Sequence, residues 1–173
     1  MLIVDPVTNT ADTTSLDGLV NLSGGLETDK WWGSILGLNG MIYCVPHNSE
    51  VVMIIDPASG VVDTTTLTGL IGGAKWSGGA TGPDGKIYTI PWDSVTVMVI
   101  DPATGTMDTT SMGGLSAANM KWRGGILAPN GVLYGLPHGE SAILKIQQPS
   151  NRQFIVAGCE GSPTQHCVFL FLL

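Results

Sequence analysis

The chain has 173 residues, the size of about one domain, and its seven basic and fourteen acidic side chains give a formal net charge of −7. Glycine accounts for 24 residues, charged side chains for only 12%, and the mean hydropathy is +0.28. This composition excludes a coiled coil and a disordered acidic chain, and the negative charge argues against unaided binding to nucleic acid. Short apolar runs between glycine, proline, aspartate and asparagine predict an all-β protein.

The cysteines and the apolar segments say little about compartment. Cys44, Cys159 and Cys167 are too few for a disulfide scaffold. No apolar run reaches the 18 residues of a membrane-spanning helix, and the first residues lack the pattern of a signal peptide. We therefore expect no transmembrane span and leave the localisation open.

An internal repeat of about 45 residues is the strongest pattern in the chain. Three tryptophans recur at intervals of 44 and 46 residues, and three tyrosines at intervals of 45 and 46: Trp32, Trp76, Trp122 and Tyr43, Tyr88, Tyr134. Asp-Pro pairs and Asp-Thr-Thr triplets repeat as well, beginning at Asp5, Asp56, Asp101 and at Asp12, Asp63, Asp108. We expect each repeated tryptophan to pack between units, and Asp56 and Asp101 to accept backbone bonds in turns.

Each unit is expected to contain four short strands. The first follows the tryptophan, as at 124–127, and an Asn-Gly or Asp-Gly turn leads to the second, at 41–45, 86–90 and 132–136. The third is almost wholly apolar, at 51–55, 95–100 and 142–146, and the fourth carries Asp-Thr-Thr. Four antiparallel strands in every 45 residues are typical of a β-propeller blade.

The motif W-x-G-G-x-x-A-P-N-G-x-x-Y-x-x-P, present over 122–137, with I-D-P-x-T at 100–104, resembles a known class of repeats. It is similar to the β-propeller repeats of the broad Kelch-like and quinoprotein-like class, especially in repeat-rich proteins of protists and microalgae. The resemblance covers about 1–148 and implies a propeller. It does not select a function, because propellers have unrelated activities.

Blade counting gives an incomplete ring. Residues 30–74 and 75–120 are two full blades, and 1–29 with 121–148 are two parts that would form a third, split blade. Residues 149–173 form a tail outside the repeat. Closed propellers have about four to eight blades, so we expect a partial ring within a longer propeller, or half of a six-bladed ring made by two chains. A closed three-bladed ring is the remaining alternative.

Residues that break the repeat are the candidate ligand-binding residues. His47, Trp92 and His138 follow the repeated proline of each unit, and the same loops contain Glu50, Asp93 and Glu140. Two histidines and a tryptophan at one blade position favour a shallow pocket for a sugar or a peptide. A metal site would lack a third ligand, and exposed loop residues without a role are the remaining alternative.

No catalytic residues, metal site or cofactor can be assigned, because the sequence contains no G-x-S-x-G, phosphate-loop or H-E-x-x-H motif. We therefore expect a non-catalytic β-propeller scaffold for protein–protein interaction, acting with a protein partner or as a homo-oligomer, as a subunit of a larger assembly. The alternatives are a carbohydrate-binding, lectin-like propeller and a metal-dependent propeller hydrolase.

Overall fold

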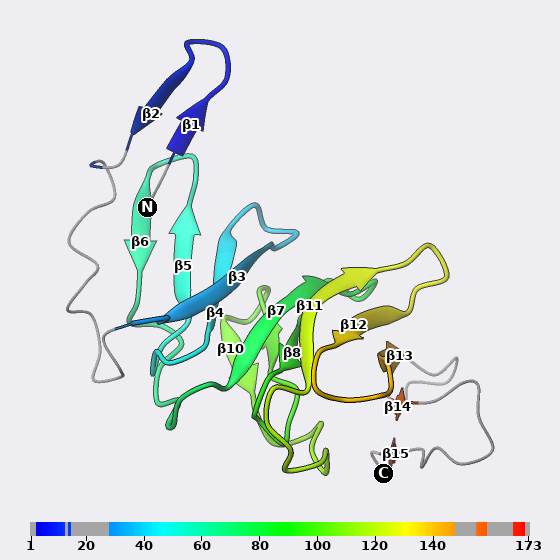
Figure 1. Cartoon of the computed structure of the whole chain (residues 1–173). Coiled ribbons are helices and arrows are strands. Elements are labelled where there is room, and N and C mark those ends of the chain that lie inside the picture. The colour runs from blue at the N-terminus through cyan, green and yellow to red at the C-terminus, as the bar shows by residue number, and fades with distance from the viewer. Residues whose placement is uncertain (1–2, 13, 15–27, 148–154, 159–167, 172–173) are drawn as a thin grey trace.

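The computed structural model describes residues 3–12, 14, 28–147, 155–158 and 168–171, and all regular secondary structure in these ranges is β-strand (Figure 1). Two four-stranded antiparallel sheets each follow chain order. The first contains β3 (Trp31–Leu36), β4 (Ile42–Pro46), β5 (Met53–Asp56) and β6 (Val61–Asp63). The second contains β7 (Trp76–Thr81), β8 (Ile87–Pro91), β9 (Val99–Asp101) and β10 (Thr106–Asp108). The predicted all-β architecture of four-stranded blades is confirmed.

The third sheet has five strands in the order β11-β12-β13-β14-β15. Its first three strands continue the repeat, whereas the last two come from the predicted tail: β11 (Trp122–Leu127), β12 (Leu133–Pro137), β13 (Leu144–Gln147), β14 (Ile155–Gly158) and β15 (Val168–Phe171). The sheets stand side by side as blades in Figure 1, and the first strand of the middle blade, β7, contacts both β3 and β11.

A separate two-stranded sheet precedes the first blade. It pairs β1 (Ile3–Asp5) with β2 (Thr10–Asp12), and Asp5 lies opposite Thr10 just as Asp101 lies opposite Thr106 in β9 and β10. The hairpin is therefore the third and fourth strand of a unit, and β13 is also a third strand. In the described residues β1 and β2 pair only with each other, so the split blade of 1–29 and 121–148 stays a prediction.

Aspartates set the turns that follow β5, β6, β9 and β10. Asp56 and Asp101 each accept a bond from the backbone N–H two residues further on, at 2.8 and 3.0 Å. The fourth strands end at Asp63 and Asp108, whose carboxylates accept bonds from Thr65 N and Thr110 N at 2.7 and 2.8 Å. The threonines of the Asp-Thr-Thr triplets therefore belong to turns, and their expected place in the fourth strand is corrected.

The structure also corrects one of the repeated tryptophans. The indole nitrogens of Trp31, Trp76 and Trp122 donate to backbone carbonyls twenty positions later, at 3.0, 2.8 and 2.7 Å: Val51 O, Thr96 O and Ala142 O. The same three residues lie opposite the repeated prolines. Trp31, and not Trp32, is thus the equivalent of Trp76 and Trp122, because a double tryptophan allowed an alignment shifted by one residue.

The core lies between blades and uses the same positions twice. We call a side chain forward-facing when it lies toward the next blade in chain order, and backward-facing when it lies toward the preceding blade. Forward-facing side chains of the first blade pack on backward-facing side chains of the second, and the second blade packs in the same way on the third. The forward set includes Tyr43, Val45 and Val52 in the first blade and Tyr88, Ile90 and Val97 in the second; the backward set includes Trp76, Ile87, Met98 and Ile100 in the second blade and Trp122, Leu133, Leu144 and Ile146 in the third. Each blade therefore presents one apolar face to each neighbour.

Candidate functional site

A chain of backbone hydrogen bonds links the three loops that follow the repeated prolines. His47 N donates to Lys30 O, Lys75 N to His47 O, and Trp92 N to Lys75 O. The chain continues from Lys121 N to Trp92 O and from His138 N to Lys121 O, and these five bonds measure 2.9 to 3.0 Å. This belt crosses from blade to blade and fixes the loop backbones relative to one another.

The belt brings four rings together in an aromatic cluster made of Trp32, His47, Trp92 and His138. Trp32 lies 4.2 Å from His47 and 5.1 Å from Trp92, measured between ring centroids. His138 lies 4.6 Å from Trp92. The structure thus places His47, Trp92 and His138 in one cluster, with Trp32 as a fourth member that the sequence assigned to packing.

Hydrogen bonding separates the two tryptophans of the cluster from the three structural ones. No acceptor for the indole nitrogen of Trp32 or Trp92 occurs in the described part of the chain. Trp32 is half-buried, and Trp92 is buried at 6% exposure. Their indole N–H groups are therefore donors that the bonding pattern of the structural tryptophans does not use.

His47 is held as a neutral acceptor. Its side chain is buried, and its Nδ1 lies 3.1 Å from Trp76 O, which assigns the proton to Nδ1. Burial lowers the pKa of His47, and the contact with Trp76 O only partly offsets this effect. At neutral pH its Nε2 therefore carries a lone pair.

Arg123 is the residue of this region that the sequence did not single out. Its guanidinium carbon lies 5.0 Å from the centroid of Trp32, and its side chain is exposed. Trp32, Ser77 and Arg123 each follow the structural tryptophan of their blade, so this position also breaks the repeat. The correct alignment of Trp31 would have revealed it.

The three acidic candidates hold neighbouring loops. Asp93 accepts a bond from Met120 N at 2.6 Å, as Asn48 does from Ala74 N at 2.8 Å in the preceding blade. Glu140 accepts a bond from the Ser116 hydroxyl at 2.7 Å. The carboxylate of Glu50 acts on Lys75 by charge, as Asp93 and Glu140 act on Lys121.

Two buried lysines bind backbone carbonyls beside the belt. They were not singled out from the sequence. Lys75 Nζ donates to Gly72 O at 2.6 Å and to His47 O at 3.1 Å, and Lys121 Nζ donates to Ala118 O at 2.8 Å. Burial lowers the pKa of Lys75 to about 8 and also lowers that of Lys121. Repetition of the Lys-Trp pair at 75 and 121 was the available signal.

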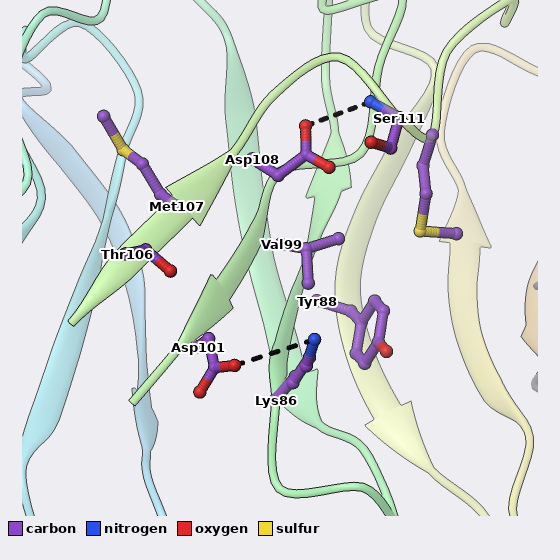
Figure 2. Close-up of a pocket in the computed structure, with 9 residues that line it drawn as sticks. Lys86, Tyr88, Val99, Asp101, Thr106, Met107, Asp108 and Ser111 are labelled. Carbon is purple, nitrogen blue, oxygen red and sulfur yellow. Dashed lines mark hydrogen bonds and ion pairs between the residues drawn. The ribbon is translucent and has the colours of Figure 1, made fainter. Parts of the chain in front are cut away.

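A separate pocket of about 350 Å³ lies on the outer part of the second blade (Figure 2). Its charged side chains are engaged with neighbours: Lys86 Nζ lies 3.6 Å from Asp101, and Asp108 accepts a bond from Ser111 N at 3.0 Å. Burial alone would raise the pKa of Asp108, but hydrogen bonds from Ser111 and Thr110 outweigh it and hold the pKa at about 2. The pocket is therefore a space beside paired groups that shape the blade.

Neither a metal site nor a membrane-spanning helix occurs among the described residues. Within the described ranges, no three His, Cys, Asp or Glu side chains gather closely enough to hold a metal ion. The same residues include no helix of the length and apolarity needed to cross a membrane.

Comparison with known proteins supports the fold. No family model and no curated protein matches the chain. Among solved structures, an auxiliary nutrient binding protein from Bacteroides ovatus is 20% identical, with a TM-score of 0.53, over 69% of this chain and 29% of that one. Virginiamycin B lyase from Staphylococcus aureus is 11% identical, with a TM-score of 0.53, over 86% of this chain and 58% of that one.

The extracellular domain of a putative hybrid two component system from B. thetaiotaomicron is 11% identical, with a TM-score of 0.56, over 98% of this chain and 26% of that one. The chain thus spans less than two thirds of each of these structures. The neighbours are propeller-like, and at these identities the likeness shows the fold alone.

Proposed function

We propose that this chain is a non-catalytic β-propeller scaffold that acts through protein contacts as a subunit of a larger assembly. The repeat motif further supports placing it with the Kelch-like and quinoprotein-like propellers. The nutrient binding protein and the two component system domain among its structural neighbours support a binding role.

The observation that carries this proposal is an apolar blade face without a neighbour. Three forward-facing side chains of the third blade, Ile126, Leu136 and Ile143, are 63%, 60% and 45% exposed. Their equivalents in the first blade, Ile35, Val45 and Val52, are only 6%, 1% and 0% exposed, because the second blade covers them. Burying an Ile or Leu side chain contributes roughly 1.5–3 kcal/mol, which favours covering this face.

The occupant that we propose is the first blade of a second copy. Its backward face carries Trp31, Met53 and Ile55, the equivalents of Trp76, Met98 and Ile100, which fill the contact between the first two blades. Two such contacts, related by a twofold axis, would close a ring of six blades.

Met53 and Ile55 are already buried in the single chain, at 6% and 2% exposure. Docking must therefore displace what covers them. The exchange of residues 1–29 between copies, as in the split blade predicted from the sequence, is the rearrangement that we propose.

Sedimentation of paired variants tests this proposal. A double substitution, Ile126→Asp with Leu136→Asp, places two carboxylates in the proposed contact and should shift the chain from twice 18.0 kDa to 18.0 kDa. The control is Leu38→Asp, which changes a side chain 78% exposed in a turn of the first blade and should leave the mass of the wild type. Equal masses for wild type and double variant would contradict the proposal.

A further inference from the structure

We propose that the aromatic cluster, with Arg123, is a saccharide-binding site in which a pyranose ring stacks on the exposed His138, beside Trp32, Trp92 and the guanidinium of Arg123. This inference is independent of the proposed assembly, since all five side chains come from the three blades of one chain. It concerns a ligand, whereas the assembly concerns the blade faces.

The aromatic cluster combines ring surfaces with hydrogen-bonding atoms. The indole N–H groups of the three structural tryptophans, Trp31, Trp76 and Trp122, donate to backbone carbonyls. Trp32 and Trp92 make no such bond within the described residues, and the bond of His47 Nδ1 to Trp76 O leaves Nε2 as an acceptor. Ring faces combined with both donors and an acceptor match the alternation of C–H and hydroxyl groups on a sugar.

The cluster combines one positively charged side chain with a neutral histidine. Arg123 lies 5.0 Å from the centroid of Trp32, and burial lowers the pKa of His47 so that it remains neutral. A cationic ligand would be repelled by the positive charge of Arg123. The arrangement favours an uncharged ligand rich in hydroxyl groups, to which Arg123 donates hydrogen bonds.

Hydrogen bonds hold the loops of the cluster in place. The backbone belt of 2.9 to 3.0 Å bonds holds the loops of His47, Trp92 and His138, and the buried ammonium of Lys75 is bound to the carbonyl of His47. A site ordered before binding loses little conformational entropy when a ligand arrives. The residue types at the positions of Trp32 and Trp92 differ from blade to blade, whereas the structural tryptophan is the same in all three blades.

The test is a glycan array with the full chain, followed by titration of the strongest hit, monitored through tryptophan fluorescence. We expect His138→Ala and Trp32→Ala each to weaken binding about tenfold or more. Trp92→Phe keeps a ring but removes a donor, and we expect it to weaken binding by a smaller factor. The control is Trp122→Phe, which alters an indole outside the cluster and should leave affinity unchanged in the folded chain.

Two results would overturn the inference. One is an array without hits for the wild type, and the other is a hit whose affinity His138→Ala and Trp32→Ala leave unchanged. His138 is exposed, so its substitution provides a test even if Trp32→Ala impairs folding. The mass of His138→Ala should equal that of the wild type, so failure of saccharide binding and failure of the proposed assembly are distinguishable.

Discussion

At the scale of single residues, neighbouring tryptophans have different roles. The indole nitrogen of Trp31 donates to Val51 O at 3.0 Å, as those of Trp76 and Trp122 donate to their own carbonyls, whereas Trp32 faces His47 and Trp92. A hydrogen bond to a buried carbonyl matters mostly because its loss leaves that carbonyl unsatisfied. The structural tryptophans should therefore be the ones on which stability depends.

Substitution of Trp76 by phenylalanine tests this difference. Trp76→Phe removes the donor to Thr96 O from a side chain only 3% exposed, and we expect a loss of about 1–3 kcal/mol in the free energy of unfolding. The matched control, Trp32→Phe, removes no such bond and should cost less than about 1 kcal/mol. Urea unfolding of both variants measures the difference, and equal costs would contradict the assignment.

Lys75 gives the protein a pH dependence with a defined sign. Burial lowers its pKa to about 8, from 10.5 for an ordinary lysine, so between these values the unfolded chain binds the proton that the folded chain has lost. The contribution of Lys75 to stability should therefore rise with pH from about 8 to about 10.5.

The measurement is the free energy of unfolding of wild type and Lys75→Met across this pH range. Cys44 acts in the opposite direction above its ordinary value of 9.0, because burial raises its pKa to about 11. The informative quantity is therefore the difference between the two proteins, to which Cys44 contributes equally. A difference that does not change with pH would show that Lys75 is not titrating as described.

At the scale of elements, close contact between first strands depends on a repeated glycine. A Cβ added to Gly78 in β7 would lie 3.0 Å from Gly124 Cα in β11, and one added to Gly33 in β3 would lie 3.0 Å from Gly78 Cα. The W-x-G motif thus combines an indole that binds its own blade with a glycine that lets the next blade approach.

Alanine substitutions separate this contact from backbone strain. Gly78→Ala and Gly60→Ala both place alanine at positive φ, 75° and 70°, which costs about 1–2 kcal/mol. Gly60 has open space around it, whereas at Gly78 the backbone of the neighbouring strand must also move. We expect Gly78→Ala to be the more destabilising in thermal unfolding, by about 1 kcal/mol or more; equal losses would mean that the strands separate without cost.

The elements were largely predictable, since the repeat fixed the number of strands per blade and Asn-Gly and Asp-Gly marked the first turns. Strand ends were less so. The carboxylates of Asp63 and Asp108 bind backbone N–H groups in the turns after β6 and β10. Such side-chain bonds compete with sheet hydrogen bonds for the same N–H groups, and strand propensity does not predict which bond forms. The strands β14 and β15 were not predicted, because residues 149–173 carry no repeat from which to infer them.

The site was predictable in part for the same reason. His47, Trp92 and His138 share one position in the repeat, so their clustering follows from the blade geometry. Trp32 and Arg123 share another, but the alignment of Trp32 with Trp76 hid it. The role of Asp93 in capping Met120 N depends on a contact 27 residues away, which spacing alone does not reveal.

At the scale of the whole molecule, the blades form a series in which the apolar forward face of a blade is covered by the blade that follows it. The first two forward faces are covered within the chain, and Ile126, Leu136 and Ile143 expose the third. If a second copy covers this face, function belongs to the assembled ring: its rims would carry two aromatic clusters, one from each chain.

The most direct test of this account is the mass of the unaltered 173-residue chain in solution, measured by light scattering over a range of concentrations. The account predicts a species of twice 18.0 kDa that dissociates on dilution or with Ile126→Asp and Leu136→Asp. A mass of 18.0 kDa at every concentration would contradict it, since the third blade would then remain uncovered by a second copy.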